Sequence, residues 1–216
     1  MEQLEIMKQR HSVRQYTDRA IEPEKRAILD ELADRANREA GLHIQIIYDE
    51  PKCFDSMMAH YGKFSGVQNY IALVGKKAAT LDETLGYYGE QLVLKAQELG
   101  LNTCWVAMTH GKSKAKIETG EKQVCLIAMG YGSTTGVEHK SKPVQALCNY
   151  RDGMPEWFLK GMEAAQLAPT AMNQQKFLFE LQSDGAVKAK CGMGFYTKLD
   201  LGIVKYHFEA GAGRKI

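Results

Sequence analysis

The sequence predicts an α+β fold. Several segments repeat apolar residues at helical spacing, and several short β-branched or aromatic runs lie between turn residues, which is typical of strands. These helices and strands do not alternate strictly, as they would around a parallel sheet. The chain has 216 residues, of which 44% are hydrophobic, so it is long enough to bury a core of its own.

The clearest predicted helix is the apolar stripe from Leu85 to Leu99. Its members follow one another at intervals of three or four residues, and Gly100 comes directly after the last of them as a C-cap. Further helices are predicted at residues 1–9, 24–38, 155–168 and 201–213.

Strands are predicted where apolar residues alternate with polar ones or form a short buried run. These segments are 42–48, 69–75, 101–108, 123–132 and 176–182. Residues 51–68 have no clear period and predict a loop with some helix. No low-complexity linker divides the chain, so we expect a single domain over residues 1–216.

Charge and hydropathy exclude several classes of protein. Lys+Arg 28 against Asp+Glu 26 gives a net charge of +2, which is too balanced for a nucleic-acid or membrane-surface binder. The basic stretch around Lys114 lacks interleaved aromatic residues and is interpreted as a solvated loop. Apolar runs such as 71–75 are far shorter than the ~20 residues of a membrane helix. The N-terminus has no apolar signal region, so we expect a cytoplasmic protein.

The cysteines and histidines do not predict a metal site. The five cysteines are widely spaced and include no CxxC pair, and the six histidines include no HxxxH pair. We therefore expect no metal, and we interpret the cysteines as small buried hydrophobic residues in a reducing compartment.

The segment RHSVR offers a candidate phosphate site. In an extended chain, side chains alternate between two faces, so Arg10, Ser12 and Arg14 point the same way. Two guanidinium groups beside a hydroxyl can bind a phosphate monoester through bidentate hydrogen bonds. The alternative interpretation of this segment alone is a solvated basic strand.

The segment GYGSTTG, residues 130–136, superficially resembles a dinucleotide-binding turn. Such a turn should lead into a helix whose N-terminus faces the pyrophosphate, but a charged stretch ending at Pro143 follows instead. We therefore reject the dinucleotide interpretation. Lys140 and Lys142 in that stretch can share a face, either to bind an anion or only as a solubilising turn.

The segment APTAMNQQKF, residues 168–177, gathers neutral hydrogen-bonding side chains. Thr170, Asn173, Gln174 and Gln175 can contact the amide-like edge of a heteroaromatic ring without burying a charge. The same residues could equally form an Asn-stabilised turn.

Taken together with residues 86–108, these segments resemble the nitroreductase family of FMN-dependent oxidoreductases. RHSVRQY is similar to that family's opening phosphate motif, and GEQLVLKAQELGLNTCW to its central helix and following strand. IAMGYG followed by HKSKP is similar to a strand and its basic phosphate contacts, and APTAMNQQKF to the motif APSxxNxQPWxF. The resemblance implies a flavoprotein fold with a central mixed or antiparallel sheet flanked by helices.

Two departures qualify the resemblance. The last motif usually follows the first helix, but residues 38–50 lack it and it comes after the GYG strand instead, as in the branch whose chain looks like two fused nitroreductase halves. This implies a first half over 1–150 and a shorter half over 151–216 that completes the FMN pocket. Thr170 keeps the hydroxyl of the usual Ser, whereas Lys176 and Phe177 replace the usual Pro-Trp wall.

The resemblance also assigns the FMN contacts. The phosphate and ribityl end is assigned to Arg10, the backbone of His11, Ser12, Arg14, Lys140 and Lys142. One side of the isoalloxazine is assigned to Trp105, Val106, Ala107 and Met108, and Lys63 to the positive charge near N1 and C2=O. The other side is assigned to Pro169, Thr170, Ala171, Asn173 and Gln175. No side chain is assigned as a catalytic acid or base.

The function implied is an FMN-dependent NAD(P)H oxidoreductase. Hydride from NAD(P)H would reach flavin N5, and an electron-poor small molecule such as a nitroaromatic or quinone would then accept it in a ping-pong scheme. The alternatives are a flavin-binding sensor or electron carrier without turnover, and a specialised flavin-linked dehydrogenase or dehalogenase. Either a monomer or a homodimer is compatible with the sequence, and neither a nucleic-acid nor a membrane partner is expected.

Overall fold

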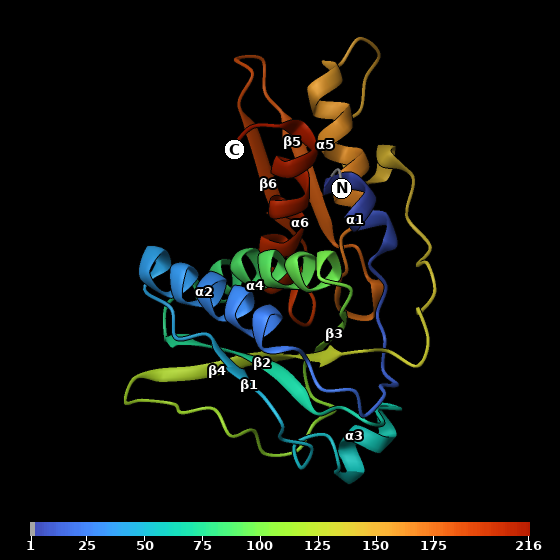
Figure 1. Ribbon diagram of the computed structural model, residues 1–216. Coiled ribbons are helices and arrows are strands. Elements are labelled where there is room, and N and C mark those ends of the chain that lie inside the picture. The colour runs from blue at the N-terminus through green and yellow to red at the C-terminus, as the bar shows by residue number, and fades with distance from the viewer. Residues whose placement is uncertain (1–2) are drawn as a thin grey trace. The chain divides into compact units, whose positions relative to one another are not determined.

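The computed structural model describes residues 3–216 and has the α+β fold that the sequence predicts (Figure 1). The helices are α1 (Gln3–Gln9), α2 (Pro23–Ala40), α3 (Met57–Tyr61), α4 (Leu81–Glu98), α5 (Glu156–Gln166) and α6 (Thr197–Ala212). The strands are β1 (Gln45–Ile47), β2 (Asn69–Lys76), β3 (Asn102–Val106), β4 (Glu121–Gly130), β5 (Phe177–Leu181) and β6 (Val187–Cys191). Two 3₁₀ turns, η1 (Val144–Ala146) and η2 (Ala171–Asn173), complete the described elements.

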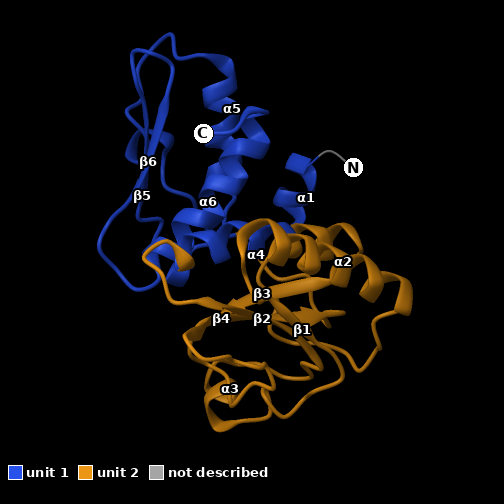
Figure 2. Ribbon diagram, turned by 90° about the vertical axis from the view of Figure 1, so that its left-hand side faces the viewer, with its two compact units in different colours: residues 1–9, 82–91, 139–216 blue, residues 10–81, 92–138 orange. Residues whose placement is uncertain are grey.

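The chain forms two compact units (Figure 2). We call residues 10–81 and 92–138 the sheet unit, and residues 1–9, 82–91 and 139–216 the hairpin unit. Helix α4 gives its first half to the hairpin unit and its second half to the sheet unit. The division into halves at residue 150 stays a prediction.

The sheet unit is built on four antiparallel strands in the order β1-β2-β4-β3. Seven of the eight residues of β2 are buried, because both faces of the sheet are covered. Helix α2 lies on one side of the sheet and α3 on the other (Figures 1 and 2). Pro23 begins α2, and Gly41, whose φ is 62°, ends it by donating its N–H to the Asn37 carbonyl.

One core cluster fills the α3 side of this sheet. Tyr70, from β2, packs near the ring of Phe54, whose centroid lies 5.2 Å from that of Phe64. The same cluster includes Val13 and Tyr16, so the segment after Arg10 is anchored in the core of the sheet unit. This anchoring fixes the backbone from which the predicted phosphate ligands project.

The hairpin unit packs α5 and the antiparallel pair β5-β6 against α6. The ring of Phe208, on α6, stacks on Phe179 at a centroid distance of 4.5 Å and meets Phe158, on α5, at 5.4 Å. Gly161 makes room for this stack, since a Cβ there would lie 2.7 Å from the Phe208 ring. Aromatic burial of this kind is a large part of what stabilises a unit of this size.

The first half of α4 crosses α6 at two glycines. A Cβ on Gly86 would lie 2.1 Å from the Leu199 carbonyl oxygen, and a Cβ on Gly202 would lie 1.9 Å from the Glu83 carbonyl oxygen. The two backbones therefore touch without intervening side chains. Lys205 and Glu83 add an ion pair of 2.6 Å beside the crossing.

The predicted elements are found with shifted ends, and one strand was not predicted. The predicted strand at 42–48 is shorter, with Leu42 forming only an isolated bridge to Gly75. Strand β6, VKAKC, was missed although it alternates apolar and polar residues, because the pattern spans only five residues whose apolar members are small and only half-buried. Among the described residues, no helix is long and apolar enough to cross a membrane.

Candidate functional site

The segment Arg10–Arg14 runs beside the start of β3 in the sheet unit. Ser12 forms a parallel bridge with Thr103, and the Val13 N–H donates to the Thr103 carbonyl at 3.0 Å. Because this bridge fixes the local register, the segment is extended, as its proposed alternation of side chains requires.

Arg10, Ser12 and Arg14 all act on the buried thiol of Cys104. The Ser12 hydroxyl hydrogen-bonds this thiol, and both guanidinium groups act on it electrostatically. Burial raises the pKa of Cys104, and Arg14, Ser12 and Arg10 only partly oppose that rise. The thiol therefore stays protonated, which agrees with its interpretation as a packing residue.

Arg10 is a buried donor in this cluster. Only 3% of its surface is exposed. No acceptor in the described chain hydrogen-bonds its Nε or Nη1 atoms, while the residue interacts with the chain elsewhere. Arg14 is exposed, and its guanidinium lies 6.0 Å from the centroid of the Phe64 ring.

The glycine loop after β4 packs against the same segment. A Cβ on Gly136, whose φ is 74°, would lie 2.7 Å from the His11 Cβ and 3.0 Å from the Ser12 carbonyl oxygen. Tyr16 bridges Gly132 a few residues further along. No helix follows this loop within residues 131–143, so the loop closes on the RHSVR segment and does not form a dinucleotide-binding turn.

The remaining candidates of the sheet unit flank this cluster. Trp105 and Val106 end β3, two and three residues beyond the bridge to Ser12, and Met108 beyond them is 70% exposed. Lys63 is exposed at a φ of 63°, and the Ser65 N–H, two residues later, donates to the Arg14 carbonyl at 3.0 Å. The candidates Arg10 to Arg14, Lys63 and Trp105 to Met108 thus belong to adjoining segments of one unit.

In the hairpin unit, the motif with Lys140 and Lys142 is tied to the motif with Thr170. The side chain of Gln175, only 4% exposed, accepts the Lys142 N–H at 2.7 Å and donates to the Lys140 carbonyl at 2.8 Å. Asn173 also donates to the Lys140 carbonyl, at 2.9 Å. Two motifs about thirty residues apart in sequence therefore form one cluster.

Some of these side chains have a structural task that the sequence did not reveal. The Lys142 ammonium donates to the carbonyls of Gln174 and Gln175 at 2.9 and 3.1 Å. The Gln175 amide is fully used in holding the two motifs together. The contacts with FMN that were assigned to Lys142 and Gln175 stay predictions. Lys140, Thr170 and Ala171 are at least partly exposed.

The loop Thr170–Gln175 has an unusual backbone. Met172, Asn173 and Gln175 have φ values of 53°, 52° and 44°, which side chains other than glycine rarely adopt. Such residues cluster where the surrounding structure holds them for a function. The Gln175 N–H donates to the Thr170 hydroxyl at 3.0 Å inside the loop.

Asp200, on α6, is a residue that the sequence analysis missed. It is 5% exposed and accepts hydrogen bonds from the Ala171 N–H at 2.9 Å and from the Gln174 amide at 2.7 Å. Burial raises its pKa to about 6, although both hydrogen bonds oppose the rise. The available signal was a lone aspartate inside the apolar run LDLGIV.

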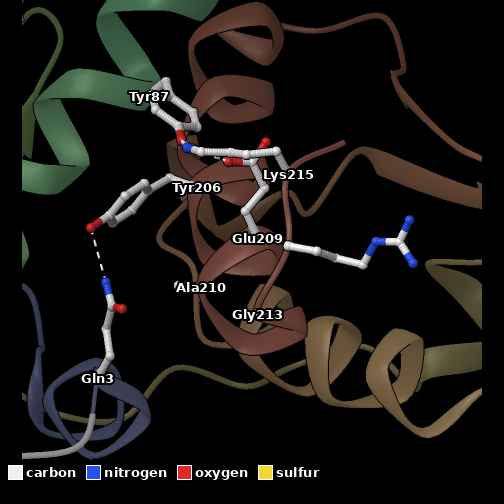
Figure 3. A pocket seen from close by; sticks show the side chains of 8 residues that line it. Gln3, Tyr87, Tyr206, Glu209, Ala210, Gly213 and Lys215 are labelled. Atoms are coloured by element: carbon white, nitrogen blue, oxygen red, sulfur yellow. Dashed lines mark hydrogen bonds and ion pairs between the residues drawn. The ribbon is translucent and has the colours of Figure 1, made fainter.

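Two hollows of the hairpin unit contain none of the assigned residues. One, of about 300 Å³, is lined by Tyr87, Tyr206, Glu209 and Lys215 among others. Figure 3 shows Tyr87, Glu209 and Lys215 turned toward one another: the Tyr87 hydroxyl donates to Glu209 at 2.6 Å, and Lys215 pairs with Glu209 at 2.8 Å. The other, of about 450 Å³, includes Arg214, whose guanidinium lies 4.3 Å from the Trp157 ring centroid. Among residues 3–216, no three His, Cys, Asp or Glu side chains gather as metal ligands would.

Comparison with known proteins identifies the family. Residues 2–212 match the family model described as "Putative TM nitroreductase". The chain belongs to this nitroreductase family. No curated protein matches it significantly.

Solved nitroreductase structures share the fold. A "putative nitroreductase" from Thermotoga maritima superposes with a TM-score of 0.73 at 22% identity, covering 100% of this chain and 87% of that one. A "putative nitroreductase" from Desulfovibrio desulfuricans, in complex with FMN, has a TM-score of 0.55 at 18% identity, covering 72% and 99%. A "putative NADH dehydrogenase/NAD(P)H nitroreductase" from Parabacteroides distasonis has a TM-score of 0.53 at 21% identity, covering 71% and 99%.

Proposed function

We propose that this nitroreductase-family protein is an FMN-dependent oxidoreductase, reduced by NADH or NADPH and reoxidised by an electron-poor small molecule such as a nitroaromatic or a quinone. The observation that carries the proposal is the cluster of Arg10, Ser12 and Arg14 beside β3. Membership of the family and the FMN complex of the Desulfovibrio desulfuricans structure support it.

The donor set of this cluster suits a phosphate monoester. Two guanidinium groups and a hydroxyl act on the same buried thiol, which stays protonated and brings no competing charge. The backbone of the Gly136 loop approaches the His11 side chain and the Ser12 carbonyl too closely for any side chain at Gly136, so this loop packs directly on the segment. In this proposal these residues bind the FMN phosphate.

The remaining residues of the sheet unit would orient the ring system. In this proposal, backbone N–H groups at and just after the end of β3, between Trp105 and Met108, would donate to the polar edge of the isoalloxazine. Lys63 would place a positive charge near N1 and C2=O, where reduction adds negative charge. The φ of 63° at Lys63 is consistent with a side chain held for a purpose.

In the hairpin unit, the loop from Pro169 to Asn173 would contact the ring, and Lys140 the phosphate or ribityl chain. These contacts come from neutral groups on a loop whose backbone is fixed by Gln175 and Asp200. FMN, when bound, supplies the two-electron redox chemistry. The chain's own residues then bind, orient and shield it, and no side chain has to move a proton.

Anaerobic reduction of the FMN-loaded protein tests this proposal. We expect NADH or NADPH to bleach the flavin absorbance, and a nitroaromatic or quinone to restore it with steady-state turnover. A protein that binds FMN but is reduced by neither nucleotide would contradict the activity while leaving the binding site in place.

A flavin-binding carrier without turnover is the second candidate. It is favoured by Lys176 and Phe177, which stand where the family motif has Pro-Trp. The Lys176 ammonium donates to the Met193 carbonyl at 2.9 Å, and Phe177 is buried in the hairpin unit. Rapid steady-state oxidation of NAD(P)H in the presence of an acceptor would rule this candidate out.

A further inference from the structure

Asp200 is a buried carboxylate that neither the sequence motifs nor the proposed cofactor contacts explain. It lies in the first turn of α6 and is 5% exposed. Its Oδ1 atom accepts the Ala171 N–H at 2.9 Å, and its Oδ2 atom accepts the Gln174 side-chain amide at 2.7 Å. Both donors belong to one short loop, so the carboxylate is directed at that loop alone.

The loop requires these hydrogen bonds because its backbone is strained. Three of its residues, Met172, Asn173 and Gln175, hold positive φ values, and none of them is glycine. A strained backbone persists only where surrounding contacts over-determine it. Asp200 bonds residues 171 and 174, on either side of the positive-φ pair Met172–Asn173.

These hydrogen bonds extend to a second segment. The Gln174 amide that donates to Asp200 also donates to the Phe195 carbonyl at 2.8 Å. Phe195 and Met193 on that segment are 80% and 94% exposed, and Met172 on the loop is 93% exposed. Asp200 thus contacts the loop directly and the second segment through Gln174, and both segments expose apolar side chains.

We propose that Asp200 is a positioning residue, which holds the Thr170–Gln175 loop in the strained conformation that presents Thr170 and Ala171 to FMN. For the contact with FMN, this role rests on the proposed function. For the conformation of the loop, it stands on the hydrogen bonds of Asp200 alone.

This role makes the loop sensitive to pH. Burial raises the pKa of Asp200 to about 6, and the hydrogen bonds from Ala171 and Gln174 only partly oppose the rise. Above that pH the ionised carboxylate accepts both hydrogen bonds, whereas a protonated carboxyl has one oxygen that must donate. FMN affinity should therefore fall as the pH drops through about 6.

The test compares D200N with the wild type and with D184N as the matched control. Asp184 likewise accepts a main-chain N–H, from Ala186 at 2.9 Å, but it lies exposed in the β5–β6 turn. FMN dissociation constants are measured by flavin fluorescence between about pH 5 and pH 8. Exchange of the Ala171 amide hydrogen is measured without FMN in the same proteins.

We expect wild type and D184N to lose FMN affinity by about fivefold or more across this range, with a midpoint near pH 6. D200N should bind about fivefold or more weakly at neutral pH and lose less affinity than the wild type as the pH falls, because only the titration of the FMN phosphate, at about pH 6, then remains. Its Ala171 amide should exchange faster. Wild-type affinity and wild-type exchange in D200N would overturn the proposal. If D200N does not fold, the same two measurements are made on Q174L. This variant removes the side-chain amide that donates to Asp200.

A failure of the proposed function gives a different result. If none of the proteins binds FMN, the FMN contact is wrong, but amide exchange still decides the positioning role. Slow exchange at Ala171 in the wild type and fast exchange in D200N would support it, and equal exchange in the two proteins would overturn it.

Discussion

The imidazole of His207 and the carboxylate of Glu90 form a hydrogen bond of 2.9 Å with both side chains fully buried. The other ring nitrogen of His207 faces the Ala164 carbonyl at 3.0 Å, so both neighbours of the ring are acceptors. The pair lies where three helices meet. It ties α4, α5 and α6 together inside the hairpin unit.

We expect the loss of one partner of this pair to lower the free energy of unfolding strongly, and a conservative replacement to lower it much less. We expect Glu90→Ala to lower the free energy of unfolding by about 3 kcal/mol, because it leaves His207 buried without its acceptor. Glu90→Gln should cost much less, since its amide can donate to a neutral imidazole. Urea unfolding of the three proteins measures both values, and equal losses in the two variants would contradict this account of the pair.

The crossing of α4 and α6 should not tolerate a methyl group. Gly86→Ala would place a Cβ 2.1 Å from the Leu199 carbonyl oxygen, and we expect a loss of about 2 kcal/mol or more despite the higher helix propensity of alanine. Gly192→Ala is the control, because its Cβ would meet nothing closer than 3.7 Å. Thermal unfolding distinguishes the two, and similar melting temperatures would show that the helices can move apart.

Ionisation of Asp200 should also affect how the stability of the protein depends on pH. Its pKa in the folded protein, about 6, lies above the ordinary value of 3.8, so folding favours the protonated form. Relative to D200N, the wild type should therefore be most stable below about pH 4 and lose up to about 3 kcal/mol as the pH rises to 6. Chemical unfolding across this range checks the sign, and a relative gain in stability with rising pH would contradict it.

Arg14 should contribute to FMN affinity without contributing much to stability. Its side chain is exposed and acts electrostatically on Cys104, so Arg14→Gln should weaken FMN binding about tenfold while the melting temperature of the apoprotein stays nearly unchanged. Arg38→Gln, an equally exposed arginine near the end of α2, serves as the control and should bind FMN like the wild type. Equal affinities in all three proteins would remove Arg14 from the site.

Local patterns in the sequence were sufficient for most of the fold. The stripe from Leu85 to Leu99 specifies α4, and the buried run of β2 specifies a central strand, because each pattern depends only on neighbours in sequence. Strand β6 gives a much weaker local signal, since its apolar–polar alternation covers only five residues, and its pairing with β5 depends on tertiary structure. That Arg10, Ser12 and Arg14 share one face stays a prediction from their spacing in an extended segment.

The hydrogen bonds that hold the candidate site together could not be predicted from the sequence. Nothing local indicates that the Gln175 amide would be consumed by the backbone of Lys140 and Lys142, or that Asp200 would accept the Ala171 N–H about thirty residues away. These contacts depend on tertiary packing, and a polar side chain in a loop motif gives the same signal whether it binds a ligand or the chain itself.

The most direct test of the central claim is a titration of the flavin-free protein with FMN, followed by flavin fluorescence and visible absorbance. The proposed site predicts saturation at about one FMN per chain, with binding weakened by Arg14→Gln and unaffected by Arg38→Gln. No uptake of FMN, or uptake that Arg14→Gln leaves unchanged, would contradict the assignment of the Arg10–Arg14 cluster to the flavin phosphate.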